Sequence, residues 1–264
     1  MPLTEQYGPL NRQIVDIYPA RGQRDAPAPV LIFIYGGGWT VGKRSLYRFL
    51  GNSYAAKGFT VAVPDYRLYP EARFPAFVDD AALAVRWVYD HIGEHGGDAK
   101  RLHLMGHSAG AHTGALLCLD QSHLAAVDLA PDRIKSFTGI AGPYSFNPLE
   151  IQSKRPIFEH LEDINVARPI KHAHGDAPPM LLLHSRPDKT VPLRNSEHLL
   201  AAITETGGSA RHIAYPLVGH VSIILSIAAP ARILAPVFRD SLAFMRTIDS
   251  NSEYENSADD PVFA

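Results

Sequence analysis

Residues 101–110 read RLHLMGHSAG, and this stretch decides the fold. It begins as a short apolar run and passes directly into Gly106-His107-Ser108-Ala109-Gly110, which matches the pattern G-x-S-x-G. A small-residue helix is predicted to begin near Ala109. A strand, a sharp turn and a helix in this order predict that the Ser108 hydroxyl projects at the carboxyl end of the strand. A glycine-rich turn that only packs the helix closely is the competing interpretation.

The rest of the chain alternates between two kinds of segment. Short apolar runs bounded by Gly or Pro predict strands buried on both faces, and longer stretches with helical spacing of apolar residues predict amphipathic helices. The predicted strands cover residues 29–35, 59–63, 102–105, 134–140, 180–184 and 211–215, and the predicted helices cover 45–57, 77–88, 193–206 and 231–247. This alternation predicts an α/β fold, with a mostly parallel central sheet and helices on both faces.

Two segments do not follow the alternation. Residues 142–177 carry repeated prolines, which predict loops and short helices that lie over one end of the sheet as a short lid. Residues 249–264, DSNSEYENSADDPVFA, are polar and acidic and predict a frayed tail. Residues 1–248 are predicted to form a single domain.

Composition and charge exclude several classes of function. The chain has 264 residues and a formal net charge of -2, which offers no attraction for a nucleic acid. Its single cysteine, Cys118, cannot form an internal disulfide, and the first residues lack the basic and apolar regions of a secretory signal. No apolar run approaches the ~20 residues that cross a bilayer. We therefore expect a cytoplasmic protein without a membrane span, and the oligomeric state stays open, with a homodimer as one option.

A serine hydroxyl is a poor nucleophile near neutral pH, so Ser108 requires a base and an acid that orients the base. His220 lies just after the last predicted strand, and Asp188 lies just after the strand before it. Both therefore belong to the sheet edge that carries Ser108. Asp176 is a weaker choice of acid because it precedes its strand. Taken singly, Asp188 is also explained as a helix cap and His220 as a polar loop residue.

Backbone donors for a negatively charged oxygen are predicted beside the serine. Three consecutive glycines, residues 36–38, directly follow the first strong strand. The N–H groups of Gly37 and Gly38, together with that of Ala109, are the expected oxyanion hole. The competing interpretation is a flexible turn between a strand and a helix.

A substrate pocket is expected next to these motifs. Trp39, Tyr35 and His107 are the predicted pocket residues, because each is adjacent in sequence to the glycines or to Ser108. The lid segment, residues 142–177, is expected to line the same pocket.

Two rival chemistries receive little support. Residues 37–43 read G-x-x-x-x-G-K after a strand, but Arg44 follows where a P-loop has the Ser or Thr that holds magnesium. His91 and His95 are four residues apart and other histidines cluster near Ser108, but the zinc motif H-E-x-x-H is absent from the sequence. A binding module that keeps the fold without the chemistry is disfavoured because the serine, acid and base positions are all occupied.

Together these residues resemble the α/β-hydrolase superfamily and, within it, the hormone-sensitive-lipase-like and related small carboxylesterases. The resemblance spans about residues 29–245 and rests on YGGGW at 35–39, DYRLYPEARFP at 65–75, GHSAG at 106–110, HSRPDKTVP at 184–192 and GHVS at 219–222. It implies an α/β-hydrolase fold, and the order Ser108, Asp188, His220 is that of the superfamily's catalytic residues.

The chain departs from this pattern in places. Relatives usually carry His where Tyr35 stands, and that imidazole braces the oxyanion loop; they usually carry Ala where Tyr69 stands. The chain is also similar to kynurenine formamidases, which share its size and an aromatic-rich oxyanion motif.

We therefore expect a serine hydrolase that cleaves carboxylic esters with small acyl groups through an acyl-enzyme, without a cofactor or a metal. Its expected substrate is a small-molecule ester. Hydrolysis of an arylformamide, which passes through the same kind of tetrahedral intermediate, is the alternative. A nucleotide-binding protein is a remote alternative.

Overall fold

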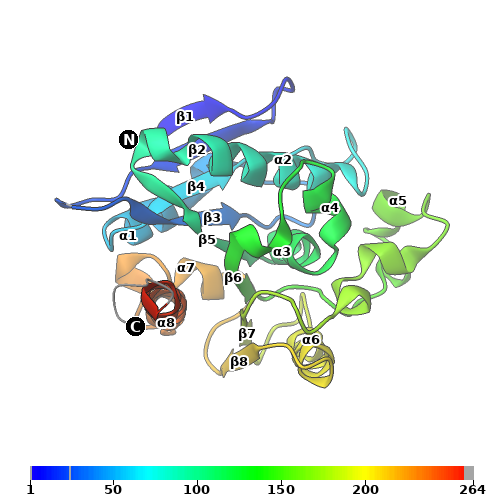
Figure 1. The fold of residues 1–264 in the computed structure, drawn as a ribbon. Coiled ribbons are helices and arrows are strands. Elements are labelled where there is room, and N and C mark those ends of the chain that lie inside the picture. Colours follow the sequence, from blue (N-terminus) through cyan, green and yellow to red (C-terminus); the bar gives the residue numbers. More distant parts are fainter. Residues whose placement is uncertain (1, 24, 259–264) are drawn as a thin grey trace.

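Eight strands form one central sheet in the computed structural model, which describes residues 2–23 and 25–258. The sheet order is β1-β2-β4-β3-β5-β6-β7-β8 (Figure 1). The strands are β1 (Leu3–Gln6), β2 (Ile14–Tyr18), β3 (Ala28–Ile34), β4 (Thr60–Pro64), β5 (Gly97–His107), β6 (Ile134–Ile140), β7 (Met180–Ser185) and β8 (Ala210–Tyr215). Strands β3 to β8 are parallel, whereas β1 and β2 are antiparallel. The predicted α/β class with a mostly parallel sheet is therefore confirmed.

The apolar runs of the sequence form the middle of this sheet. Every residue of β3 and β4 is buried, as expected for strands covered on both faces. Strands β1 and β2 were not predicted, because β1 is short and largely exposed, and Asp16 interrupts the apolar residues of β2. They extend the sheet beyond β4 on one side.

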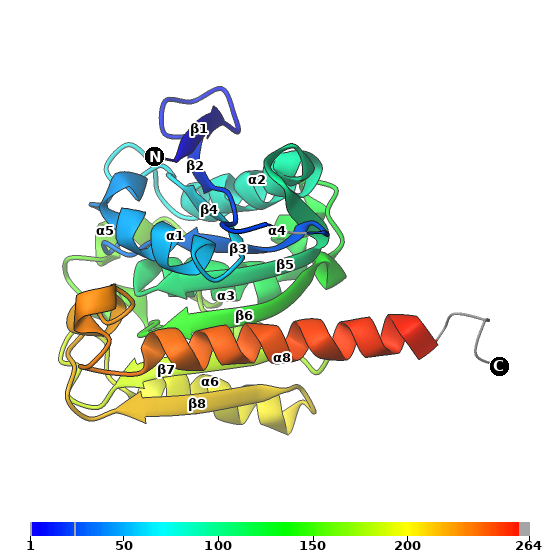
Figure 2. The same cartoon turned by 90° about the vertical axis from the view of Figure 1, so that its left-hand side faces the viewer.

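Helices cover both faces of the sheet, as predicted. Helices α1 and α8 lie on one face, and α2, α3 and α6 lie on the other (Figures 1 and 2). The helices are α1 (Arg48–Ala55), α2 (Ala76–His91), α3 (Ala109–Leu119), α4 (Gln121–Ala125), α5 (Arg155–Phe158), α6 (Arg194–Glu205), α7 (Ser222–Leu225) and α8 (Val237–Ala258). Short 3-10 helices are η1 (Arg44–Tyr47), η2 (Ile92–His95), η3 (Pro131–Arg133), η4 (Pro148–Glu150), η5 (Ile164–Ala167), η6 (Pro169–His172) and η7 (Ala229–Ala231). Within the described ranges, no helix has both the length and the apolar character needed to cross a membrane.

Residues 142–177, named the cap segment here, contain η4, α5, η5 and η6 joined by loops. In Figure 2 the strand arrows point to the side of the molecule on which α5 and α7 lie. The cap segment thus reaches the carboxyl end of the parallel strands, where the loops that follow β3, β5, β7 and β8 also lie.

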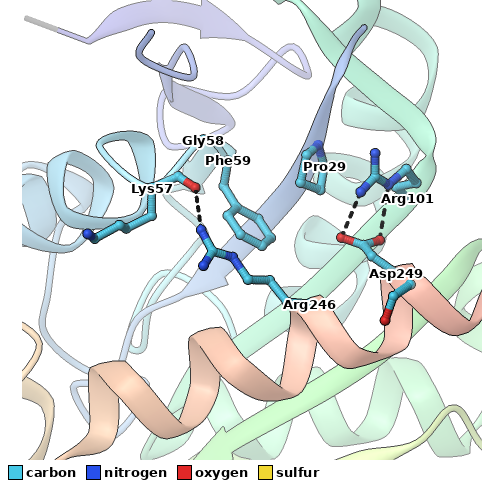
Figure 3. A pocket seen from close by; sticks show the side chains of 8 residues that line it. Pro29, Lys57, Gly58, Phe59, Arg101, Arg246 and Asp249 are labelled. Carbon is cyan, nitrogen blue, oxygen red and sulfur yellow. Dashed lines mark hydrogen bonds and ion pairs between the residues drawn. The ribbon is translucent and has the colours of Figure 1, made fainter. Parts of the chain in front are cut away.

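The predicted tail boundary at residue 249 is wrong, because α8 continues without a break to Ala258. Asp249 is buried at the edge of a small pocket of about 250 Å³. Figure 3 shows Asp249 facing the guanidinium group of Arg101, and Arg246 donating to the carbonyl of Lys57. Val237, Leu242 and Met245 bury the apolar face of α8, and these polar contacts add to that packing near Asp249. Residues 259–264 of the predicted tail lie outside the described residues.

A buried ion pair joins α2 to the segment that follows β4. The Asp80 carboxylate is completely buried and accepts two hydrogen bonds from the Arg67 guanidinium, at 2.7 and 2.8 Å. The amide of Gln13 donates a further bond to Asp80 at 2.7 Å. This carboxylate therefore connects the amino-terminal segment, α2 and residues 65–68 near the carboxyl end of the parallel strands.

We expect Arg67→Met to lower the free energy of unfolding by about 3–5 kcal/mol, because it leaves the Asp80 carboxylate buried without its cation. The matched control is Arg239→Met, which removes a largely exposed arginine beside Asp240 and should cost no more than about 1 kcal/mol. Urea unfolding of the three proteins measures both values. Equal losses in the two variants would contradict the importance of the buried pair.

Candidate active site

Ser108 lies at the sharp turn between β5 and α3, in a backbone conformation that L-residues rarely adopt. Its φ is 53° and its ψ is -121°. A side chain at Gly106 would place its Cβ 2.3 Å from the Gly110 carbonyl oxygen, and one at Gly110 would meet the Ile34 carbonyl oxygen at 2.1 Å. Glycine is therefore required on both sides of the serine, because β3, β5 and α3 approach closely here.

The structure brings together the three residues that the sequence predicted. The Ser108 hydroxyl oxygen lies 2.8 Å from Nε2 of His220. The Nδ1 atom of the same imidazole lies 2.7 Å from Oδ2 of Asp188. Because a carboxylate only accepts hydrogen bonds, Nδ1 carries the hydrogen and Nε2 is left to accept the serine proton.

Asp188 combines both of the interpretations that its position in the sequence allowed. Its Oδ1 atom accepts backbone hydrogen bonds from Thr190 at 2.8 Å and Val191 at 2.9 Å, so it caps the turn that precedes α6. Its Oδ2 atom orients His220. The second predicted acid, Asp176, lies in a turn before β7 and is exposed, away from this pair.

The loop that carries His220 is held from several sides. Ser185 at the end of β7 donates to the carbonyl of Val218, and the Ser222 hydroxyl accepts from the N–H of Gly219 at 2.7 Å. His107, the residue before the serine, donates from Nε2 to the carbonyl of His220 at 3.0 Å. These bonds fix the backbone on both sides of the imidazole.

Burial and hydrogen bonding set the charges in the site. Burial of Asp188 opposes its ionisation, but the hydrogen bonds from His220, Val191 and Thr190 outweigh burial and hold the pKa of this carboxyl below its usual value. Burial, together with the neighbouring His220, lowers the pKa of His107 to about 3. His107 is therefore a neutral hydrogen-bond donor at physiological pH, and Asp188 is ionised.

The glycine loop after β3 lies against the serine. A Cβ at Gly36 would come within 2.9 Å of the Ser108 Cβ, and Gly37 and Gly38 have φ values of 138° and 58°. The Gly37 carbonyl accepts from the N–H groups of Thr40 and Val41, which closes the loop into a tight turn. The N–H groups of Gly37, Gly38 and Ala109 form no hydrogen bond with any described residue, and all three residues line the pocket beside Ser108. They are available to a bound oxygen atom.

A family model matches this chain over residues 15–203, well over half of its length, and the family is BD-FAE. The chain belongs to the BD-FAE family. Its α/β-hydrolase fold is that of known esterases: it superimposes on the structure of Thermogutta terrifontis esterase 2 with propionate bound with a TM-score of 0.71, at 21% identity, over 98% of this chain and 94% of the other.

Curated relatives of this BD-FAE chain carry esterase names. A probable isoprenylcysteine alpha-carbonyl methylesterase of Oryza sativa subsp. japonica is 28% identical over 83% of this chain and 58% of the relative. Esterase LipQ of Mycobacterium tuberculosis is 29% identical over 89% of this chain and 60% of the relative. The chain therefore spans little more than half the length of these relatives.

Tyr35 was predicted to line the pocket of this BD-FAE chain, and the structure corrects that prediction. The Tyr35 side chain is completely buried behind the glycine loop. Its hydroxyl is directed away from the pocket, because it donates to Asp65 at 2.8 Å and accepts from Arg12 at 2.9 Å. Arg12 also donates to the carbonyl of Gly42, and Arg44 pairs with Asp65 at 2.7 Å. Tyr35 thus supports the glycine loop from behind.

The pocket beside Ser108 has a volume of about 840 Å³ and a mainly apolar lining. Trp39 and His107 line it as predicted, and so does the cap segment through Phe146 and Lys154. Trp39 is itself 2% exposed, and its ring packs between Phe77 and Phe146. Only a small part of the Trp39 ring therefore faces the pocket.

Sequence reasoning missed several residues of this site. It named Arg44 only as a departure from the P-loop pattern and included Asp65 only as the first residue of the motif at 65–75, whereas the two form the ion pair behind the glycine loop. One signal was present, because Asp65 directly follows β4 at the catalytic edge. Lys154 and Asn195 also line the pocket, and no motif marks either of them.

The histidines that suggested a metal site have separate partners. His91 bonds the carbonyl of Trp87, His112 bonds the carbonyl of Ala167, and His103 lies between Ser136 and Asp249. Each imidazole is therefore engaged in its own part of the fold.

We expect Tyr35→Phe to lower the free energy of unfolding by about 1–3 kcal/mol, because it removes a hydroxyl that bonds a buried carboxylate and an arginine. Tyr18→Phe is the matched control: the Tyr18 hydroxyl is also buried but has no partner among the described residues, so its removal should cost little. Thermal or urea unfolding distinguishes the two. A Tyr35→Phe variant as stable as the wild type would contradict the bracing role.

We expect the wild type to lose stability relative to the Asp188→Asn variant as the pH is lowered into the acid range. Because the pKa of folded Asp188 lies below its usual value, the carboxylate stabilises the fold above that usual value, and this contribution is lost as pH falls through the folded pKa. The difference in unfolding free energy should shift against the wild type as pH falls below the usual pKa of an aspartate, which is about 4. Urea unfolding across this range measures it, and a difference that does not change with pH would refute the expectation.

Proposed function

We propose that this BD-FAE chain hydrolyses carboxylic esters through an acyl-enzyme formed on Ser108. The observation that carries the proposal is the continuous pair of hydrogen bonds from Ser108 through His220 to Asp188, at 2.8 and 2.7 Å. Ser108 and His220 both line the apolar pocket, and so do the residues whose N–H groups form the proposed oxyanion hole. The esterase names of the relatives support the same reaction.

In the first half of the reaction, His220 takes the proton of Ser108 as the serine oxygen attacks the ester carbonyl carbon. The imidazolium that forms is stabilised by the Asp188 carboxylate. It then gives the proton to the leaving alcohol as the ester C–O bond breaks. Water repeats the sequence on the acyl-enzyme and releases the carboxylic acid, which leaves Ser108 protonated again.

The negative charge that develops on the carbonyl oxygen requires donors that are already in place. The N–H groups of Gly37, Gly38 and Ala109 supply them without any rearrangement, since none of them bonds another described residue. A single donor of this kind contributes about 3–4 kcal/mol to lowering the barrier. The ion pairs of Asp65 with Arg12 and Arg44 behind the loop keep the donors in position.

Small acyl groups remain the proposed preference of this site. The propionate bound in the structure of Thermogutta terrifontis esterase 2 supports it. The pocket of about 840 Å³ is larger than a small acyl group needs, so we assign the remaining space to the alcohol part of the ester. A cytoplasmic location stays a prediction from the sequence, and a homodimer stays one option for the oligomeric state.

We expect Ser108→Ala to lower kcat/KM for p-nitrophenyl acetate and butyrate by at least about a thousandfold, because the variant cannot form the acyl-enzyme. Ser209→Ala, an exposed serine before β8, is the matched control and should keep the wild-type rate. The release of p-nitrophenol measures both.

Two results would contradict the proposal. One is ester hydrolysis that survives Ser108→Ala. The other is a wild-type kcat/KM for N-formylkynurenine well above that for every ester tested, which would identify an arylformamidase instead.

A further inference from the structure

Lys154 of the cap segment contacts the glycine loop. Its ammonium group donates to the carbonyl of Gly38 at 3.0 Å, and a Cβ at Gly38 would lie 2.3 Å from the Lys154 nitrogen. The lysine directly precedes α5 and lines the same pocket as Ser108. A positive charge thus lies next to the proposed oxyanion hole.

No described residue forms an ion pair with this charge. Among the described residues that line the pocket, Lys154 is the one lysine or arginine, and none is an aspartate or glutamate. Burial alone accounts for the lowered pKa of Lys154, so no nearby carboxylate offsets the cost of removing the ammonium group from water. The carbonyl of Gly38 compensates that cost only in part.

The ammonium group has three N–H donors, and the protein uses one of them. The others are available to a molecule in the pocket. A carboxylate is the partner that compensates a half-buried ammonium best, because it accepts the N–H groups and also supplies the negative charge that a neutral carbonyl lacks. An ester with a neutral remainder leaves the charge in the pocket uncompensated.

We propose that Lys154 forms an anion subsite in this pocket, and that the preferred substrates are esters that carry a carboxylate. The inference rests on the proposed ester hydrolysis and names the substrate class for that same site. The carboxylate binds the free N–H groups of Lys154, while the ester carbonyl oxygen lies against Gly37, Gly38 and Ala109. Lys154 is therefore a specificity-determining residue that takes no part in proton transfer.

If Lys154 only holds the cap segment to the glycine loop through its hydrogen bond to Gly38, a different result is predicted. Loss of that hydrogen bond would weaken hydrolysis of every ester by the same factor, since the loop serves all substrates. Loss of a subsite would weaken hydrolysis of carboxylate-bearing esters alone. The ratio of kcat/KM within a matched substrate pair separates the two roles.

The experiment uses two substrate pairs that differ only in charge. Monomethyl adipate and methyl adipamate place the charge on the acyl part, and para-acetoxybenzoate and para-acetoxybenzamide place it on the alcohol part. Titration of released acid or absorbance of released phenol gives kcat/KM for wild type, Lys154→Met, Lys154→Arg and the control Lys171→Met. Lys171 is an exposed lysine of the cap segment outside the pocket lining.

We expect the wild type to prefer the charged member of at least one pair by about tenfold or more. Lys154→Met should abolish that preference, chiefly through a higher KM for the charged ester, whereas Lys154→Arg and Lys171→Met should retain it. A wild type without a preference in either pair, or a preference that survives Lys154→Met, would overturn the subsite. Failure of the proposed function is separate, because it would appear as hydrolysis of the neutral esters that survives Ser108→Ala.

Discussion

The close approach of three backbone segments around Ser108 is the constraint on which the site depends. Strands β3 and β5 and helix α3 meet so tightly at Gly106 and Gly110 that no Cβ fits at either glycine. This packing holds Ser108 at a φ of 53°, which costs local backbone energy and is supported by the buried strands around it. The hydroxyl therefore has a fixed position at the sheet edge where the loops after β7 and β8 deliver Asp188 and His220.

A second layer of polar contacts supports the glycine loop. Tyr35, Asp65, Arg12 and Arg44 form a connected set of hydrogen bonds and ion pairs behind the loop, and they join residues up to 53 positions apart in the sequence, from Arg12 to Asp65. The phenol of Tyr35 is the centre of this set, because its hydroxyl accepts from Arg12 and donates to Asp65. This support matters because unsupported glycines would not keep their N–H groups directed at one point.

The sequence predicted those features that depend on local pattern and on chain order. Ser108, Asp188 and His220 were found because parallel strands deliver the loops that follow them to one edge, so position along the chain implies position in space. The pocket position of Tyr35, the tail boundary at residue 249 and the presence of Lys154 could not be derived in this way. Each depends on a partner distant in sequence, namely Asp65, Arg101 and Gly38, and a polar side chain alone does not reveal such a partner.

The hydrogen bond from His107 to the carbonyl of His220 has a consequence for how the motif is used. Pattern descriptions leave the residue before the serine unspecified, yet here it clamps the loop that carries the base. Transplanting the five residues of the turn into another hydrolase would import a buried neutral imidazole without the His220 carbonyl that accepts its hydrogen bond. In this chain, the turn and the distant histidine loop have to be exchanged together as one unit.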